Sequence, residues 1–135
     1  TIRYTKLFGL ARNLSYIVVM QNHYIQLKSD TLKTIVYNEE KVLVMFGSKF
    51  CSWCKKIVET ELNDLANENK ECILVYVESE TSTGGWNFPR SMRLLSKEPD
   101  QWPWWAYFEN GELIDTTATS SVMEVKKWFA YIQRI

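Results

Sequence analysis

Runs of consecutive apolar residues recur along the chain and predict the strands of a sheet. Near-continuous runs at Lys41–Phe46 and Cys72–Val77 are typical of central strands that are buried on both faces. Between two later runs, the sequence Glu109-Asn110-Gly111-Glu112 predicts a tight hairpin turn, because Asn-Gly tolerates the positive φ angles of such turns. The shorter runs predict three further strands, at Tyr24–Lys28, Trp104–Phe108 and Leu113–Ala118.

Segments whose apolar residues lie three or four positions apart alternate with these runs and predict helices. Ser29-Asp30 caps one helix, a longer helix runs from Ser52 towards Asn69, and Ser120-Ser121 caps the last. Pro89 is expected in the first turn of a short helix that continues through Lys97. The resulting order, β-α-β-α-β-α-β-β-α, predicts an α/β domain that ends in an antiparallel hairpin and a helix.

Length and charge narrow the class of protein. The chain has 135 residues, enough for one domain, and its 16 acidic residues balance 16 basic ones. A net charge of zero lacks the basic footprint of a nucleic-acid binder, so we expect no nucleic-acid partner. The longest uncharged stretch, Asn13–Leu27, contains several polar residues, and no membrane span is predicted.

Residues 1–21 precede the α/β pattern, and we interpret them as an N-terminal extension of a domain at residues 22–135. Three basic residues come before the apolar run Tyr16–Met20, an order that faintly resembles a secretory signal. No small-residue cleavage site follows that run, so an ordinary amphipathic helix is the favoured interpretation. The apolar face of that helix would consist of Leu7, Leu10, Ala11 and Leu14.

The candidate chemistry is a pair of cysteines, Cys51 and Cys54, placed where a buried strand gives way to a helix. Free N–H groups and the helix dipole at such a position stabilise a thiolate. We therefore predict that Cys51 is the nucleophile, with a lowered pKa, and that Cys54 is the resolving thiol. Lys49 and Lys55, together with Lys56, add positive charge that favours the Cys51 thiolate.

Two other interpretations of the cysteines stay open. Cys51, Cys54, Cys72 and His23 could together form a zinc site, although no second closely spaced ligand pair is present. The cysteine pair could also be an inert element of a binding module. Cys72, within an apolar run, is expected in the core, and His23 is expected at the surface.

From residue 22 to residue 135 the chain resembles the thioredoxin family. The resemblance rests on the apolar strand before Cys51, on Cys51-Ser52-Trp53-Cys54-Lys55, and on Trp102-Pro103 ahead of a strand and the Asn110-Gly111-Glu112 turn. It implies a thioredoxin fold, a central mixed sheet flanked by helices, and disulfide exchange through the cysteine pair with no other cofactor. It also implies that Pro103 is a cis-proline facing the disulfide, and that the backbone of Trp102 pairs with an extended substrate.

The chain departs from the thioredoxin pattern at informative positions. Met45 stands where the family carries a buried aspartate, and Glu78 is a candidate substitute for that proton relay. Ser52-Trp53 replaces Gly-Pro between the cysteines, and Phe50 replaces tryptophan before them. These departures favour disulfide formation over a general reductase role, which remains the alternative beside a non-catalytic interaction or zinc module. About ten additional residues, around Gly84-Gly85, separate the third strand from the proline.

The motif Gly-x-Lys-x-Cys-x-x-Cys-x-Lys, from Gly47 to Lys56, resembles the small thioredoxin-like accessory proteins of Gram-positive bacteriocin operons. That resemblance implies help with disulfide formation in an exported peptide. We therefore favour an extracytoplasmic location in a Gram-positive bacterium, with the cytoplasm as the alternative. The expected partners are a cysteine-containing peptide or protein and a redox partner protein, and the chain itself is expected to be a monomer.

The chain holds six tryptophans, more than its core needs. We predict that Trp53, Trp102 and Trp86 form an apolar rim around the disulfide, where an extended peptide binds. Trp104 and Trp105 are adjacent in a predicted strand, so one is expected in the core and the other facing outward. Trp128 is expected in the core, on the apolar face of the last helix.

Overall fold

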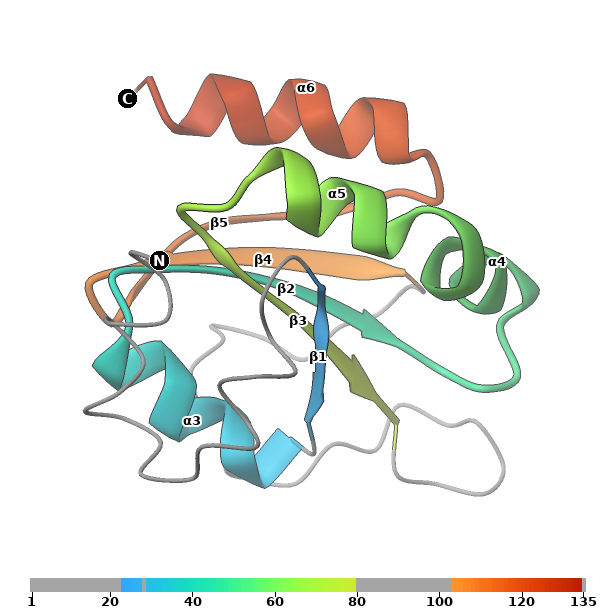
Figure 1. Ribbon diagram of the computed structural model, residues 1–135, viewed down its shortest axis with the longest axis horizontal. Helices are drawn as coiled ribbons and strands as arrows, with labels where there is room; N and C mark the ends of the chain where they lie inside the picture. Colours follow the sequence, from blue (N-terminus) through green and yellow to red (C-terminus); the bar gives the residue numbers. More distant parts are fainter. Residues whose placement is uncertain (1–22, 28, 80–102, 135) are drawn as a thin grey trace.

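The computed structural model describes residues 23–27, 29–79 and 103–134, which form a five-stranded sheet covered by helices on both faces (Figure 1). The strand order is β1-β3-β2-β4-β5. The strands are β1 (Ile25–Leu27), β2 (Lys41–Gly47), β3 (Ile73–Glu78), β4 (Trp104–Glu109) and β5 (Glu112–Ala118). The helices are α3 (Ser29–Asn38), α4 (Ser52–Thr60), α5 (Leu62–Glu68) and α6 (Val122–Ile132).

The sheet is mixed. Strands β1, β3 and β2 run parallel, whereas β4 is antiparallel to β2 and β5 is antiparallel to β4. Met45 of β2 is paired with Tyr76 on one side and with Trp105 on the other. Because Phe46 pairs with Trp104, the end of β2 and the start of β4 meet at one edge of the sheet. The α/β class and the mixed sheet with a C-terminal hairpin and helix are thereby confirmed.

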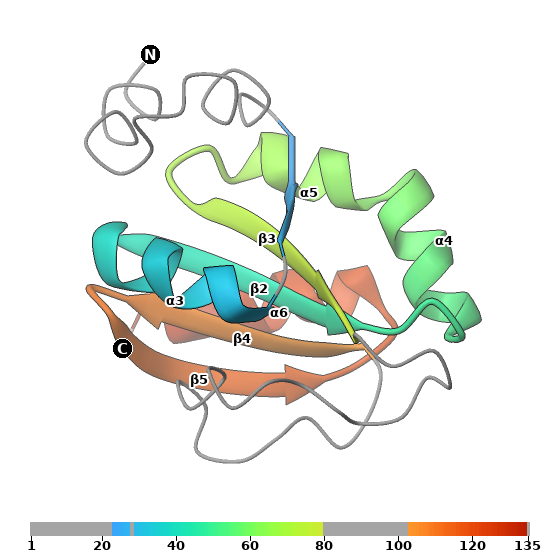
Figure 2. The same ribbon diagram turned by 90° about the horizontal axis from the view of Figure 1, so that it is seen from below.

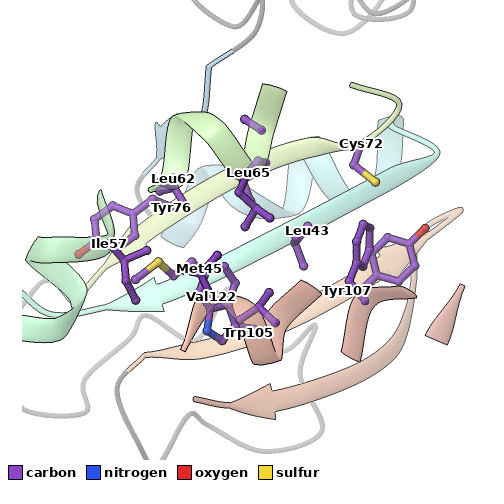
Figure 3. Packing of buried hydrophobic residues seen from close by; sticks show 14 of the residues in the cluster. Leu43, Met45, Ile57, Leu62, Leu65, Cys72, Tyr76, Trp105, Tyr107 and Val122 are labelled. Carbon is purple, nitrogen blue, oxygen red and sulfur yellow. The ribbon is translucent and has the colours of Figure 1, made fainter. Parts of the chain in front are cut away.

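The sheet divides the core into two layers, because successive residues of a strand point to opposite faces and helices cover both faces (Figures 1 and 2). Helix α3 covers one face, and α4, α5 and α6 cover the other. We call the first layer the α3-side core; from β2 it contains Val42, Val44 and Phe46. The second layer is the α6-side core, which includes Leu43, Met45 and Cys54 and is drawn in Figure 3.

Trp104 and Trp105 lie on opposite faces, but the prediction that one of them faces outward is wrong. Their side chains are 5% and 0% exposed. Trp104 belongs to the α3-side core and Trp105 to the α6-side core. Since β4 is an internal strand and helices cover both faces of the sheet, neither side chain reaches solvent. Trp128, expected in the core, is half-buried, and its indole N–H donates to Asp115 at 2.9 Å.

The helix predicted from Ser52 to Asn69 is two helices that meet at Glu61, where φ is −125°. Just before the break, the Thr60 hydroxyl donates to the Lys56 carbonyl at 2.6 Å. This type of side-chain bond competes with the backbone ladder and bends helices. The break lets α4 and α5 each turn apolar residues towards the twisted sheet.

The hairpin turn is confirmed. Asn110 and Gly111 have positive φ angles of 53° and 84°, as a tight turn between two twisted strands requires. The Asn110 N–H also donates to the Glu40 carbonyl at 2.7 Å, which fixes the turn to the loop before β2.

Several predictions fall outside the described residues: the extension at 1–21, the helix from Pro89 to Lys97, and the loop around Gly84-Gly85. Within the described ranges, no helix has the length and apolar character needed to span a bilayer.

Candidate active site

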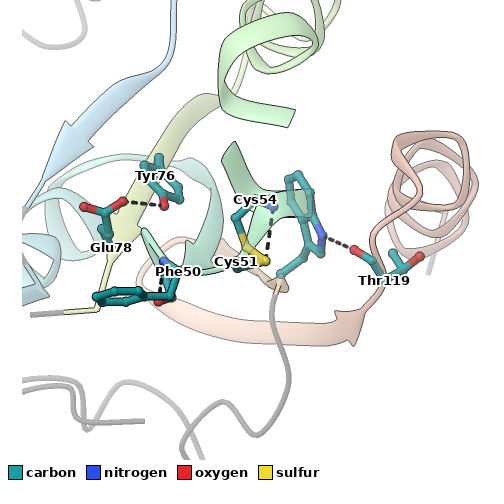
Figure 4. The surroundings of a disulfide bond; sticks show 8 residues. Phe50, Cys51, Cys54, Tyr76, Glu78 and Thr119 are labelled. Atoms are coloured by element: carbon teal, nitrogen blue, oxygen red, sulfur yellow. Dashed lines mark hydrogen bonds between the residues drawn. A yellow bond between two sulfur atoms is a disulfide. The ribbon is translucent and has the colours of Figure 1, made fainter. Parts of the chain in front are cut away.

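The two cysteines lie at the N-terminus of α4, directly after the loop that follows β2 (Figure 4). Cys51 is the N-cap residue, with extended backbone angles φ −95° and ψ 109°. Its Sγ atom accepts the backbone N–H of Cys54 at 3.1 Å. The sulfur therefore occupies the position of a capping oxygen, where it faces the positive end of the helix dipole.

Cys51 and Cys54 form a disulfide, with their Cα atoms 5.3 Å apart. The two sulfurs differ in accessibility, because Cys54 is completely buried whereas Cys51 is half-buried. An incoming thiolate can therefore reach Cys51 and not Cys54. This asymmetry matches the predicted roles of an outer nucleophile and an inner resolving thiol.

Ser48 holds the loop that presents Cys51. Its side chain is buried, its carbonyl accepts the Cys51 N–H at 3.0 Å, and its hydroxyl accepts the Phe50 N–H at 3.2 Å. One turn later, the Lys55 N–H donates to the Cys51 carbonyl at 3.1 Å. These bonds position the disulfide on a fixed backbone.

The surroundings of Cys54 are largely apolar. Met45 and Ile57 are buried in the same cluster, and so is Trp105, whose indole N–H donates to the Thr119 carbonyl at 3.0 Å. Met45 thus lies in the core beneath the motif without supplying an ionisable group.

Tyr76 is a residue of this site that the sequence analysis missed. A Cβ atom added to Gly47 would lie 2.8 Å from the Tyr76 ring, 2.9 Å from its hydroxyl and 3.1 Å from Cys54 Sγ. The glycine is therefore required by the close approach of these two side chains. The Tyr76 hydroxyl donates to Glu78 at 3.1 Å, and burial, with the nearby Glu78 carboxylate, raises the pKa of Tyr76.

A cavity of about 260 Å³ opens beside the motif, on the side of β3. The two predicted thiolate-stabilising residues, Lys49 and Lys55, are exposed and line this cavity. Their effect on the pKa of Cys51 stays a prediction. The other lining residues are Gln26, Ser48, Val58, Glu59, Tyr76 and Glu78.

Two large aromatic side chains are exposed next to the disulfide: Phe50 is 61% exposed and Trp53 is 56% exposed. The Lys49 ammonium lies 5.5 Å from the centre of the Phe50 ring, and the Lys56 ammonium lies 5.7 Å from that of Trp53. We call Phe50 and Trp53 the aromatic rim. Trp53 was predicted to belong to such a surface, whereas Phe50 was noted only as a departure from a family pattern.

Pro103 is buried immediately before β4, at the sheet edge where β2 ends. That its peptide bond is cis stays a prediction. Trp102 and Trp86, the other two predicted binding residues, lie outside the described residues.

The zinc interpretation of the cysteines finds no matching cluster. Throughout the described ranges, which include all four proposed ligands, no three His, Cys, Asp or Glu side chains are grouped to hold a metal ion. His23 is exposed, and Cys72, which forms no disulfide, is buried in the α6-side core, as expected for both.

Solved structures that share the fold of this chain include several thioredoxins. Thioredoxin f from spinach chloroplast (long form) is 12% identical, with a TM-score of 0.65 over 85% of this chain and 90% of that one. Thioredoxin f2 from Chlamydomonas reinhardtii is 20% identical, with a TM-score of 0.63 over 82% and 96%. A thioredoxin f2 in complex with ferredoxin:thioredoxin reductase is 10% identical, with a TM-score of 0.66 over 84% and 98%. The chain therefore has the thioredoxin fold. No protein-family model and no curated protein sequence matches it.

Proposed function

We propose that the protein is a thiol–disulfide oxidoreductase that acts on cysteines of peptides or proteins. The observation that carries this proposal is the asymmetric disulfide at the start of α4. Cys51 is accessible and its Sγ accepts the Cys54 N–H, while Cys54 is buried directly behind it. The disulfide itself is the redox group, so the reaction needs no further cofactor.

In the proposed reaction a substrate thiolate attacks Cys51 Sγ, and the Cys51–Cys54 bond breaks with Cys54 as the leaving group. The product is a mixed disulfide between substrate and Cys51. A second substrate thiolate then attacks the substrate sulfur of that bond and releases Cys51. The substrate gains a disulfide and loses two electrons, which reduce the protein to its dithiol form.

Disulfide formation is the direction that we propose. The hydrogen bond to Cys51 Sγ and the helix N-terminus stabilise a Cys51 thiolate and hence the reduced protein. A stabilised reduced form makes the corresponding disulfide a stronger oxidant.

The proposed substrate is an extended peptide that contacts the aromatic rim. Each of the two exposed rings has one lysine ammonium over it, and the rings offer apolar surface on which apolar side chains of a peptide can pack. We further propose that Trp102, Pro103 and Trp86 complete this binding surface. The Gly47-to-Lys56 motif supports an accessory role towards an exported, bacteriocin-type peptide of a Gram-positive bacterium. A redox partner protein would reoxidise the dithiol. The thioredoxin f2 that shares this fold was itself solved in complex with a redox partner, a reductase.

Trapping of mixed disulfides tests this proposal. Cys54→Ser is expected to accumulate covalent adducts with a peptide that carries a disulfide, because the Cys51 thiolate attacks that disulfide and no resolving thiol then releases the bound half. Cys51→Ser is expected to form none, and Cys72→Ser is the matched control in which wild-type turnover persists. If Cys54→Ser and Cys51→Ser trap equally little peptide, the protein is a non-catalytic binding module and the proposal fails.

The reduction potential of the cysteine pair separates the two directions. Equilibration with glutathione is expected to give a value clearly more positive than roughly −270 mV, the potential typical of thioredoxin. A potential near that of thioredoxin would instead make the protein a general disulfide reductase.

A further inference from the structure

Cys54 needs a route for a proton that its surroundings do not obviously provide. The thiolate and not the thiol attacks a disulfide, so Cys54 loses a proton whenever it resolves a mixed disulfide on Cys51. In the reverse reaction it leaves as a thiolate and regains one. Its side chain is completely buried, which excludes direct exchange with bulk water.

The hydroxyl of Tyr76 is the polar group that the fold brings next to this sulfur. Gly47 separates the two side chains, and one point beside its Cα lies 2.9 Å from the Tyr76 hydroxyl and 3.1 Å from Cys54 Sγ. Figure 4 shows Tyr76 and Glu78 on one side of the disulfide, at the end of β3. The Tyr76 hydroxyl and Cys54 Sγ are therefore at most about 6 Å apart, a span that one bridging water molecule can cover.

Glu78 continues the path outward from Tyr76. Its carboxylate accepts the Tyr76 hydroxyl at 3.1 Å, and its side chain is half-buried. Both residues line the cavity of about 260 Å³ that the exposed side chains of Lys49 and Lys55 border. A proton on Glu78 therefore has access to water, which a proton on Cys54 lacks.

We infer that Tyr76 and Glu78 form a proton relay for Cys54, an inference that rests on the proposed disulfide exchange. When Cys54 resolves a mixed disulfide, its proton passes to the Tyr76 oxygen while the Tyr76 proton passes to Glu78. The Cys54 thiolate then attacks Cys51 Sγ and expels the partner thiolate. In the reverse step Tyr76 donates to the departing Cys54 sulfur and takes a proton from Glu78. Tyr76 ends each step neutral.

The charges around the relay suit a tyrosine that is never ionised. Burial raises the pKa of Tyr76, and the neighbouring Glu78 and Tyr24 act in the same direction. The other ionisable groups that line the cavity are Lys49, Lys55 and Glu59. Because the Tyr76 hydroxyl donates to the Glu78 carboxylate, Glu78 is the proton acceptor and Tyr76 is the bridge to it.

The chain contains a matched control for this relay. Tyr107 on β4 is also buried in the α6-side core and donates to Glu109, two residues further on, at 2.8 Å. Its ring packs edge-on against Phe129, with ring centres 4.9 Å apart, away from the disulfide. Both pairs thus share sequence spacing, burial and hydrogen bond, and only the Tyr76 pair adjoins Cys54.

The experiment follows the two thiols separately by stopped flow. Reduced protein, carrying Cys72→Ala so that no third thiol reacts, is mixed with 5,5′-dithiobis(2-nitrobenzoate) between pH 5 and 9. The first release of thionitrobenzoate reports attack by Cys51, and the second reports attack by Cys54 on the mixed disulfide. Tyr76→Phe and Glu78→Gln are compared with Tyr107→Phe and Glu109→Gln, and thermal unfolding checks that each variant is folded.

Tyr76→Phe and Glu78→Gln are expected to slow the second release about 100-fold near pH 6, with the first release unchanged. Their second phase should gain about tenfold per pH unit, because hydroxide then replaces the relay, whereas the wild type is nearly independent of pH. The Tyr107 and Glu109 variants should remain within about twofold of wild type. Equal second phases in all four variants would overturn the relay and leave the proposed function intact. Absence of the first phase in the wild type would overturn the proposed function itself.

Discussion

The α6-side core has two ends that carry nearly the same side chains and differ in chemistry. At one end lie Cys54 and the Tyr76–Glu78 pair, and at the other lie Cys72 and the Tyr107–Glu109 pair. Figure 3 shows Tyr76 towards one end of this core and Cys72 and Tyr107 towards the other. Cys54 is bonded to a second cysteine at a helix N-terminus, whereas Cys72 forms no disulfide and lies between a turn and the start of β3. The residue types are thus insufficient for function. A glycine, a loop and a helix start make one end a candidate redox centre.

The largest effect is expected from Gly47→Ala, which breaks the end that carries the disulfide. The added Cβ would lie 2.8 Å from the Tyr76 ring and 3.1 Å from Cys54 Sγ, so these side chains must move. Overpacking of this kind lowers the free energy of unfolding by about 1–3 kcal/mol. Urea denaturation measures that loss, and glutathione equilibration is expected to show an altered potential.

Cys72→Ala is the control for Gly47→Ala at the other end of the core. It removes one buried sulfur and is expected to cost about 1 kcal/mol of stability with no change in potential. A potential that shifts as much in Cys72→Ala as in Gly47→Ala would contradict the distinction between the two ends.

At the surface, the aromatic rim beside the disulfide can be compared with exposed apolar side chains on α6. Phe50→Ala and Trp53→Ala are each expected to lower kcat/KM for a peptide substrate about tenfold, roughly 1.4 kcal/mol of binding in the transition state. Stability should change by less than about 0.5 kcal/mol, since both rings are exposed. Met123 and Tyr131 on α6, 64% and 66% exposed, provide the matched controls. The rim has no binding role if Met123→Ala and Tyr131→Ala reduce kcat/KM equally.

The smallest difference between the two ends is expected in alkaline stability, where both should behave alike. Burial raises the pKa of both Tyr76 and Tyr107, so above pH 10 the unfolded chain loses these protons first. The stabilisation that the two tyrosines contribute is therefore fully present below pH 10. Above that pH the free energy of unfolding declines, by at most about 1.4 kcal/mol per pH unit for each tyrosine. Urea denaturation between pH 8 and 11 measures the slope. Tyr76→Phe and Tyr107→Phe should each reduce it, and an unchanged slope in the double variant would contradict this cause.

The strands and the hairpin were predictable because their signals are local. The apolar run at Lys41–Phe46 and the Asn110-Gly111 turn each determine their own conformation. The break at Glu61 was not predicted because the helical periodicity of apolar residues continues across it. In the sequence, Thr60 looks like any exposed threonine, and nothing there shows that its hydroxyl bonds the Lys56 carbonyl.

At the candidate site, the cysteine pair was predictable from its position between a strand and a helix. The closeness of Tyr76 to Cys54 was not predictable from the sequence. It depends on the register between β2 and β3 and on glycine's lack of a side chain at position 47. Gly47 is the sequence feature that could have indicated this contact, but a glycine indicates a close approach only once the side chains that pack against it are known. Trp104 and Trp105 were correctly expected on opposite faces of a strand, but the burial of Trp105 depends on packing against α6, a distant element.

The division of the predicted long helix into α4 and α5 has a consequence for local unfolding. Only Cys54 and Ile57 of the nine residues in α4 are buried, whereas α5 anchors itself with Leu62, Leu65 and Ala66. One of the two anchors of α4 is therefore the residue whose covalent state changes during the proposed reaction. Because segments with few buried contacts open as separate cooperative units, α4 can loosen on reduction while α5 and the sheet stay closed. Amide hydrogen exchange in this one helix would then record the oxidation state of the whole protein.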